Sequence, residues 1–330
     1  MFPAENPQPI PGIYLWGIEL IKAIQSIKSP ALTAALTFIT ELGTERFYLP
    51  VILFIFWWID EKKGFRLGIL VILSAWINIF FKNIFKQPRP FNFDPSLGLA
   101  YEPTYGAPSG HAQNSICFWI PIAAWLAGGK TGRRRIVIWV AAIFFLLLLG
   151  FTRLYLGVHF PTDLFAGWIL GALIIFSAYV LSPLFIKHLA GQTRMQNICA
   201  AIAALFMINI FPFDRSLPAV FLGFCLGYNI MKKNFPYGTN TGIKDKKLFV
   251  MFLRCITGFT GLVVIYVVLK LLLPGEGSLF GDIRMWNQTS PFYELGRFIR
   301  YGAIGLWASA GAPMVFQRIG ISFTPKSEDN

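Results

Sequence analysis

Long apolar segments dominate the chain, and short polar segments separate them. Runs of about 20 apolar residues, the length needed to cross a bilayer, recur along the whole chain. About nine segments of this kind can be placed, at about 31–59, 65–85, 111–128, 135–152, 163–186, 197–212, 216–231, 248–273 and 293–315. The pattern therefore predicts an all-α fold, a polytopic membrane helix bundle with about nine transmembrane helices.

The first apolar segment contains a polar interruption. Glu41, Glu45 and Arg46 lie close to Gly43, and charged side chains are expensive inside lipid. We therefore expect a span that is broken near Gly43, or an N-terminal half that only dips into the membrane. Residues 11–28 precede this segment and show a roughly helical alternation of apolar and polar positions, which predicts a helix lying in the membrane interface.

Composition and charge support a membrane protein. The chain is 55% hydrophobic and only 14% charged, too apolar for an ordinary soluble domain of 330 residues. Its net charge of +13 is scattered between the apolar segments, so no basic face indicates a nucleic-acid partner. Lys and Arg concentrate in alternate loops, at 60–66, 129–135, 187–194 and 232–247. The positive-inside rule places these four loops in the cytoplasm and the loops at 86–110 and 153–162 on the opposite face.

Three polar stretches on that opposite face carry the candidate chemistry: "KNIFKQPRP" (82–90), "PSGH" (108–111) and "TRLYLGVHFPTD" (152–163). Each lies where an apolar segment begins or ends. Lys82, Arg89 and Arg153 supply three cations, and arginine forks bind phosphate through two hydrogen bonds at once. Any one of these cations alone would be interpreted as an interfacial anchor. The three together indicate a site for an anionic headgroup.

Histidines accompany these cations. His159 is followed after four residues by Asp163, whose carboxylate could fix the imidazole tautomer and leave the other ring nitrogen as a nucleophile. Ser109 can cap the apolar run that follows it, and Gly110 lets the backbone approach an anion at the start of that helix. His111 could donate a proton to a leaving oxygen.

Taken together, the three stretches resemble the three-part signature of the type 2 phosphatidic acid phosphatase (PAP2) superfamily. All three parts occur in order and with the family's spacing, over about residues 30–187. Thr152 stands where the family usually has serine, which retains a hydroxyl. The resemblance implies that His159 is a nucleophile forming a phosphohistidine and Asp163 its orienter. His111 would then be the general acid and base. The same resemblance assigns the phosphate-binding groups, which are Lys82, Arg89, Ser109, Gly110 and Arg153.

The resemblance also implies an activity, that of a membrane phosphatase that hydrolyses the phosphomonoester or pyrophosphate of a lipid. Its partners would be a phosphorylated lipid substrate and membrane lipids. Fixed cations can stabilise a transferring phosphoryl group, so we expect a metal-independent enzyme without a cofactor. In a bacterium we expect the inner membrane, with the active site facing the periplasm or exterior, and in a eukaryote a site facing the ER lumen.

The polar motifs divide the chain. We expect an N-terminal interfacial helix (1–30), a PAP2-like catalytic membrane core (31–190) and additional C-terminal transmembrane helices without an assigned role (191–330). Two alternatives to the lipid phosphatase remain open. One is a phosphotransferase or a sugar-phosphate phosphatase resembling glucose-6-phosphatase. The other is a non-catalytic lipid transporter in which the motifs are vestigial.

Overall fold

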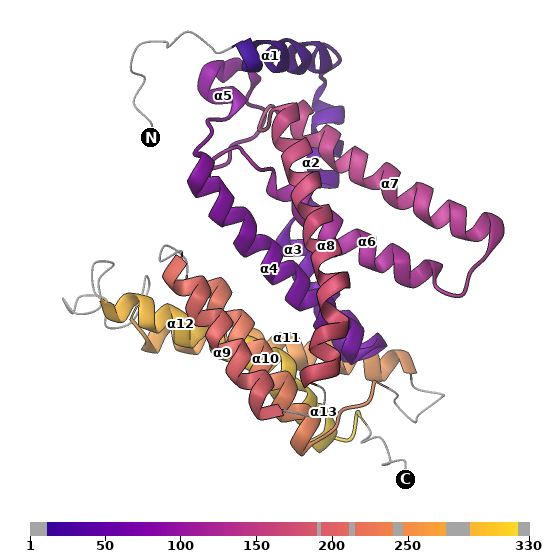
Figure 1. The fold of residues 1–330 in the computed structure, drawn as a ribbon, viewed down its shortest axis with the longest axis vertical. Helices are drawn as coiled ribbons and strands as arrows, with labels where there is room; N and C mark the ends of the chain where they lie inside the picture. Colours follow the sequence, from indigo (N-terminus) through magenta and orange to yellow (C-terminus); the bar gives the residue numbers. More distant parts are fainter. Residues whose placement is uncertain (1–11, 190–192, 211–214, 240–246, 275–290, 323–330) are drawn as a thin grey trace. The chain divides into compact units, whose positions relative to one another are not determined.

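The structure is a computed structural model, and it describes residues 12–189, 193–210, 215–239, 247–274 and 291–322. The regular elements within these ranges are helices (Figure 1), so the all-α prediction is confirmed. The first half contains α1 (Gly12–Gln25), α2 (Pro30–Glu41), α3 (Glu45–Phe54), η1 (Ile55–Ile59), α4 (Glu61–Phe85), α5 (Pro90–Phe93), η2 (Pro95–Leu97), α6 (Gly110–Ala127) and α7 (Gly132–Tyr155). The second half contains α8 (Pro161–Leu189), α9 (Thr193–Ile210), α10 (Ser216–Asn234), α11 (Lys247–Leu272), α12 (Pro291–Leu306), η4 (Trp307–Gly311) and α13 (Ala312–Arg318).

Four of the described helical segments are long and apolar enough to cross a membrane. They are Glu61–Phe93, Gly132–Tyr155, Pro161–Pro183 and Leu248–Leu272. A fifth span arises if α2 and the Glu45–Ile59 helix, which are bent by 45° at their junction, count as one broken span. That bend lies at the polar interruption near Gly43. The other predicted spans coincide with α6, α9, α10 and α12, and their membrane crossing stays a prediction.

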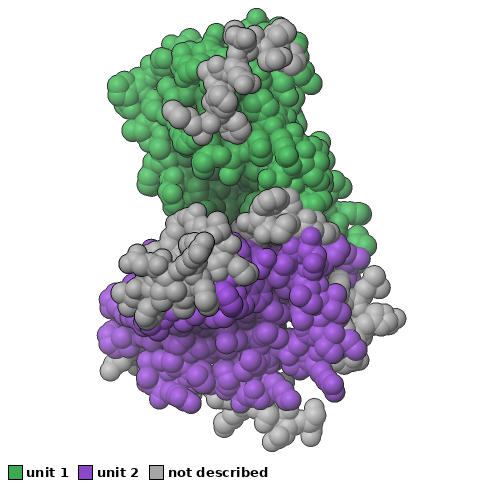
Figure 2. Space-filling model, turned by 90° about the vertical axis from the view of Figure 1, so that its left-hand side faces the viewer, with its two compact units in different colours: residues 1–49, 73–180 green, residues 50–72, 181–330 purple. Residues whose placement is uncertain are grey.

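Contacts group the chain into two compact units (Figure 2). Unit 1 comprises residues 1–49 and 73–180, and unit 2 comprises residues 50–72 and 181–330. Helices α4 and α8 each contribute residues to both units. The division at residues 30 and 190 that the motifs suggest runs along the sequence and stays a prediction.

Unit 1 is held together by polar contacts between helices as well as by apolar ones. The buried amide of Asn78 on α4 donates to Gln113 Oε1 on α6 at 2.9 Å, and the Gln113 amide donates to the Ser74 carbonyl at 2.8 Å. A Cβ at Gly167 of α8 would lie 2.6 Å from the Ser109 carbonyl oxygen. Only glycine therefore allows α8 to approach the start of α6, and this approach brings the "PSGH" stretch beside the start of α8.

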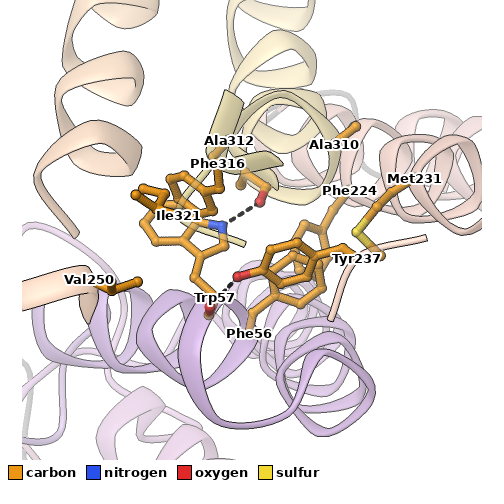
Figure 3. Close-up of a cluster of buried hydrophobic side chains, with 11 residues drawn as sticks. Phe56, Trp57, Phe224, Met231, Tyr237, Val250, Ala310, Ala312, Phe316 and Ile321 are labelled. Carbon is orange, nitrogen blue, oxygen red and sulfur yellow. Dashed lines mark hydrogen bonds between the residues drawn. The ribbon is translucent and has the colours of Figure 1, made fainter. Parts of the chain in front are cut away.

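Unit 2 has an aromatic core (Figure 3). The buried indole of Trp57 donates to the Ala308 carbonyl at 2.8 Å, and the Tyr237 hydroxyl donates to the Trp57 carbonyl. Phe316 packs edge-on against Trp57 with a ring-centroid distance of 5.8 Å. Close helix contact also requires glycine here, since a Cβ at Gly223 on α10 would lie 2.0 Å from a carbonyl oxygen of α12.

Candidate active site

The ends of several helices of unit 1 gather the candidate residues. Lys82 lies in the last turn of α4, and Arg89 is the N-cap residue of α5, which begins with proline. Arg153 lies in the last turn of α7. His159 follows in the short connection to α8, and Asp163 lies in the first turn of that helix. The helix boundaries thus place five of the predicted residues at element ends, where polar side chains can face one another.

The His159–Asp163 pair forms as its spacing predicts. His159 Nδ1 lies 3.2 Å from Asp163 Oδ2, and both side chains are buried. Asp163 is itself held in place, because Oδ2 accepts from the Phe160 backbone N–H at 2.9 Å and Oδ1 accepts from Gln87 Nε2 at 2.5 Å. These bonds fix the carboxylate, and the carboxylate in turn fixes the imidazole.

The contacts of His159 determine which ring nitrogen is free of a proton. His159 Nε2 lies 3.2 Å from Arg89 Nη1, and a guanidinium nitrogen can only donate. Nε2 therefore accepts, and the proton lies on Nδ1 toward Asp163. Burial lowers the pKa of His159 well below its usual value, and the positive charges of Arg89 and Lys82 lower it further. The imidazole is therefore neutral near pH 7 and carries an unprotonated Nε2.

Arg89 is buried and fully engaged. Besides His159, its Nη1 donates to the Val158 carbonyl at 2.8 Å and its Nε donates to the Thr104 carbonyl at 2.6 Å. Its Nη2 donates to Glu102 Oε2 at 2.9 Å. The guanidinium is therefore fixed in orientation directly beside the candidate nucleophile.

Lys82 and Arg153 complete the group of cations. Lys82 Nζ donates to the Tyr105 carbonyl, and it lies beside a pocket of about 270 Å³ lined also by Thr104 and Tyr105. Arg153 donates from Nη1 to the Thr40 hydroxyl at 2.9 Å and from Nη2 to Glu102 Oε1. Its buried Nε has no hydrogen-bond partner in the described part of the chain. One N–H of this arginine thus remains available to a ligand.

The "PSGH" stretch ends in the first turn of α6, and its groups contact other residues of unit 1. Ser109 is the N-cap of α6, and its hydroxyl accepts from the Ala112 N–H at 3.4 Å. Its backbone N–H donates to the Asp163 carbonyl at 2.9 Å, so this amide is not free for an anion. A Cβ at Gly110 would lie 3.0 Å from Asn78 Oδ1. His111 Nε2 is buried and has no hydrogen-bond partner among the described residues.

The site contains polar residues that no motif singled out. Glu102 bridges Arg89 and Arg153, Thr104 contacts Arg89 and Lys82, and Gln87 holds Asp163. Thr40 comes from α2, far away in sequence. Glu102 is visible in the sequence only as one of several scattered carboxylates.

The donor set does not favour a metal centre. Within the described residues, no group of three or more His, Cys, Asp or Glu side chains is arranged so that it could hold a metal ion. The four cysteines, all within described segments, are free thiols. The charged groups that converge on His159 are mostly cations, and cations bind an anion.

Two family profiles match the chain. The profile described as "PAP2 superfamily" matches residues 63–187, which include every candidate residue named in the motifs. The profile described as "PAP2 superfamily phosphatase, transmembrane extension" matches residues 216–324. The second match covers the segment for which the motifs gave no role.

Three curated proteins illustrate the similarity. The undecaprenyl-diphosphatase of Sulfolobus acidocaldarius is 31% identical over 49% of this chain and 76% of its own length. The phosphatidylglycerophosphatase B of Bacillus subtilis is 32% identical over 47% of this chain and 77% of its own. The sphingosine-1-phosphate phosphatase 1 of Rattus norvegicus is 28% identical over 86% of this chain and 71% of its own. The chain is therefore an integral membrane protein that belongs to the PAP2 superfamily of phosphatases and carries the transmembrane extension found in that superfamily.

Proposed function

We propose that this protein hydrolyses the phosphomonoester or pyrophosphate group of a membrane lipid, with His159 as the nucleophile. The observation that carries the proposal is the position of the His159 imidazole. It lies between Asp163, which holds the proton on Nδ1, and Arg89, which marks the anion site next to Nε2. Names of similar proteins support a lipid phosphate as the substrate, since all three act on phosphorylated lipids by name.

The first chemical step follows from this geometry. The lone pair of His159 Nε2 attacks phosphorus, the bond from phosphorus to the leaving oxygen breaks, and a phosphohistidine forms. Asp163 stabilises the positive charge that develops on the imidazole, as the carboxylate of a catalytic triad does. His111, in its protonated form, donates through Nε2 the proton that the leaving oxygen needs; this Nε2 has no hydrogen-bond partner among the described residues.

The second step returns the enzyme to its starting state. His111, now neutral, takes a proton from water while the water oxygen attacks phosphorus, and the bond from phosphorus to Nε2 breaks. The products are inorganic phosphate and the free imidazole of His159. The same residue thus acts first as acid and then as base.

Fixed positive charge supplies most of the stabilisation of the phosphoryl oxygens. Lys82, Arg89 and Arg153 are largely buried, so their charges act in a medium that screens them weakly. The Arg153 Nε–H has no other partner among the described atoms, and the Ser109 hydroxyl can donate its hydrogen while it continues to accept from Ala112. No step of this scheme requires a metal ion.

We further propose that the site faces away from the cytoplasm. Helices α4 and α7 are 25 and 24 residues long, about 37 Å and about 36 Å at 1.5 Å per residue. Each has basic residues in its first two turns and a site residue, Lys82 or Arg153, in its last turn. The positive-inside rule then places the site at the periplasmic or exterior surface, or in the ER lumen. Crossing of the membrane by α6, α9, α10 and α12 would give about nine spans.

Among lipid phosphates, we rank a single-chain phosphomonoester first. The rat sphingosine-1-phosphate phosphatase aligns with most of the chain, including the transmembrane extension, whereas the archaeal and Bacillus proteins align with about half of it. An extension shared with that relative is the feature that favours its class of substrate.

Phosphate release by purified protein in detergent tests the proposal. The panel contains sphingosine 1-phosphate, phosphatidate, phosphatidylglycerol phosphate, undecaprenyl pyrophosphate and glucose 6-phosphate, each with and without EDTA. We expect release from at least one lipid that survives EDTA and that His159→Ala abolishes. Folded protein that releases phosphate from none of the lipids would overturn the proposal, and release from glucose 6-phosphate alone would replace the lipid with a sugar phosphate.

A further inference from the structure

Glu102 is the acidic side chain that pairs with two cations of the site. Its Oε2 accepts from Arg89 Nη2 at 2.9 Å, and its Oε1 accepts from Arg153 Nη2. A phosphoryl group bound by both arginines needs the same two N–H donors. We propose that Glu102 occupies the position that a phosphoryl group takes on binding and that the substrate must displace it. The inference rests on the proposed function, because it concerns the same anion site.

Backbone carbonyls next to Glu102 also accept hydrogen bonds from the cations of the site. The Thr104 carbonyl accepts from Arg89 Nε at 2.6 Å, and the carbonyls of Tyr105 and Gly106 accept from Lys82 Nζ. The Gly106 N–H donates to the Gln87 carbonyl at 2.8 Å, which fixes the far end of the segment. Residues 102–106 therefore offer acceptors to all three cations, and of the described N–H groups of Arg153 only Nη2 is engaged by them.

Differences in exposure show which partner moves. The Glu102 side chain is 27% exposed, whereas the side chains of Arg89 and Arg153 are 1% and 3% exposed. A carboxylate that already contacts solvent can turn outward and keep its hydration, but the two buried guanidinium groups have no comparable path to water. Glu102 leaves the site, and the arginines stay.

A phosphomonoester satisfies the site better than this carboxylate does. The carboxylate brings one negative charge and two oxygens, whereas a phosphomonoester brings up to two charges and three oxygens. In the part of the chain that the structure describes, the buried Arg153 Nε and His111 Nε2 remain without partners while Glu102 is in place. The third terminal oxygen of a phosphomonoester is left over for Arg153 Nε, and its ester oxygen is left over for His111 Nε2.

Internal competition of this kind lowers the affinity of the site for every anion by the same factor. Membranes contain phosphodiester headgroups in great excess over phosphomonoesters, and each diester carries one negative charge on its phosphate. Glu102 keeps such weakly bound headgroups from saturating the site, and it promotes release of inorganic phosphate after turnover. It thus sets the affinity of the anion site and is not a catalytic residue.

Inhibition by inorganic phosphate tests the inference. Glu102→Gln removes the competing charge and retains the shape of the side chain, so we expect the Ki for inorganic phosphate and the KM to fall together by about tenfold, or about 1.4 kcal/mol. Glu102→Asp retains the charge and should stay closer to the wild type. Asp94→Asn is the matched control, since Asp94 lies in the same loop but pairs with Lys22.

A rise in Ki and KM on Glu102→Gln would overturn the inference. If Glu102 only aligned the arginines, Glu102→Gln would raise Ki and KM; unchanged values would show that it does neither. We expect Glu102→Ser to lower Ki and KM as well, and this variant replaces Glu102→Gln in the test if Glu102→Gln does not fold. Stabilisation of the protein against heat by inorganic phosphate measures the same affinity without turnover. A protein that hydrolyses no lipid, yet binds phosphate more tightly as Glu102→Gln, refutes the proposed function and leaves this inference standing.

Discussion

Both units bury arginines, and they use them differently. In unit 2, Arg254 is 1% exposed and donates to the backbone carbonyls of Trp57, Thr239 and Ile321, so its guanidinium ties chain segments together. In unit 1, Arg89 and Arg153 share the carboxylate of Glu102, and Arg89 also contacts the imidazole of His159. A buried cation therefore does not mark a functional site by itself. A functional site is indicated where several cations converge on a group that can react.

Removal of the reacting group, the imidazole of His159, should reduce hydrolysis more than any other change. His159→Ala deletes the nucleophile and leaves the cations, so we expect hydrolysis to fall by about 1,000-fold or more, as removal of a nucleophile does in other enzymes. The protein should still bind inorganic phosphate, which heat stability in its presence measures. Hydrolysis within tenfold of the wild type would show that another group attacks phosphorus.

Arg153→Lys tests whether the site needs arginine geometry or only positive charge. Lysine retains the charge but loses the fork and the Nε–H that has no other described partner. We expect kcat/KM to fall by about 100-fold, the cost of losing one well-placed donor to a transition state. Arg134→Lys, at an exposed position early in α7, is the control and should be neutral. Equal effects of the two substitutions would argue against a site at Arg153.

Arg254→Met tests the structural role of the buried arginine in unit 2. The change leaves three carbonyl groups of unit 2 without their donor, so we expect a loss of about 1–3 kcal/mol of stability and a lower melting temperature. The kcat of the protein that remains folded should not change. Arg318→Met, at an exposed position in the last turn of α13, is the matched control. A tenfold loss of kcat without loss of stability would assign Arg254 a part in the reaction.

A smaller effect concerns pH. Burial and the neighbouring cations lower the pKa of His159 below the usual 6.5, so the imidazole stays unprotonated and nucleophilic at pH values under 6.5. The acidic limb of the kcat profile, which protonation of His159 sets, should therefore lie below pH 6.5. Lys82→Met removes one of those cations, and the acidic limb of the kcat profile should move upward, toward pH 6.5. A limb that stays in place, or moves downward, would mean that it belongs to another group.

The sequence predicts the parts of this molecule that depend on local patterns. Apolar periodicity finds the helices, the charges near Gly43 find the bend between α2 and α3, and the spacing from His159 to Asp163 brings their side chains into contact because both flank one helix start. The orientation of α4 and α7 that the basic loops suggest stays a prediction.

Residues that act through tertiary contact have no such pattern. Glu102 and Thr104 lie in a connection without regular structure, and Thr40 reaches Arg153 from a helix more than a hundred residues away. Gln113, two residues after the "PSGH" stretch, ties α6 to α4 through hydrogen bonds that no sequence motif indicates. In each case the packing of the helices determines the hydrogen-bond partner. That packing cannot be read from a single sequence.

The central claim is that a phosphoryl group passes through His159 Nε2. Its most direct test is to trap the intermediate by rapid quenching of the wild type and of His111→Gln, which loses the base that activates water together with the acid of the first step. Each protein is mixed with ³²P-labelled sphingosine 1-phosphate, or with whichever lipid of the panel the wild type hydrolyses, and is quenched in alkali. We predict label on the peptide that contains His159, stable in alkali and lost in acid, and no label in His111→Gln/His159→Ala. Label on any other residue, or a wild type that turns over while no phosphohistidine forms in any variant, would contradict the account.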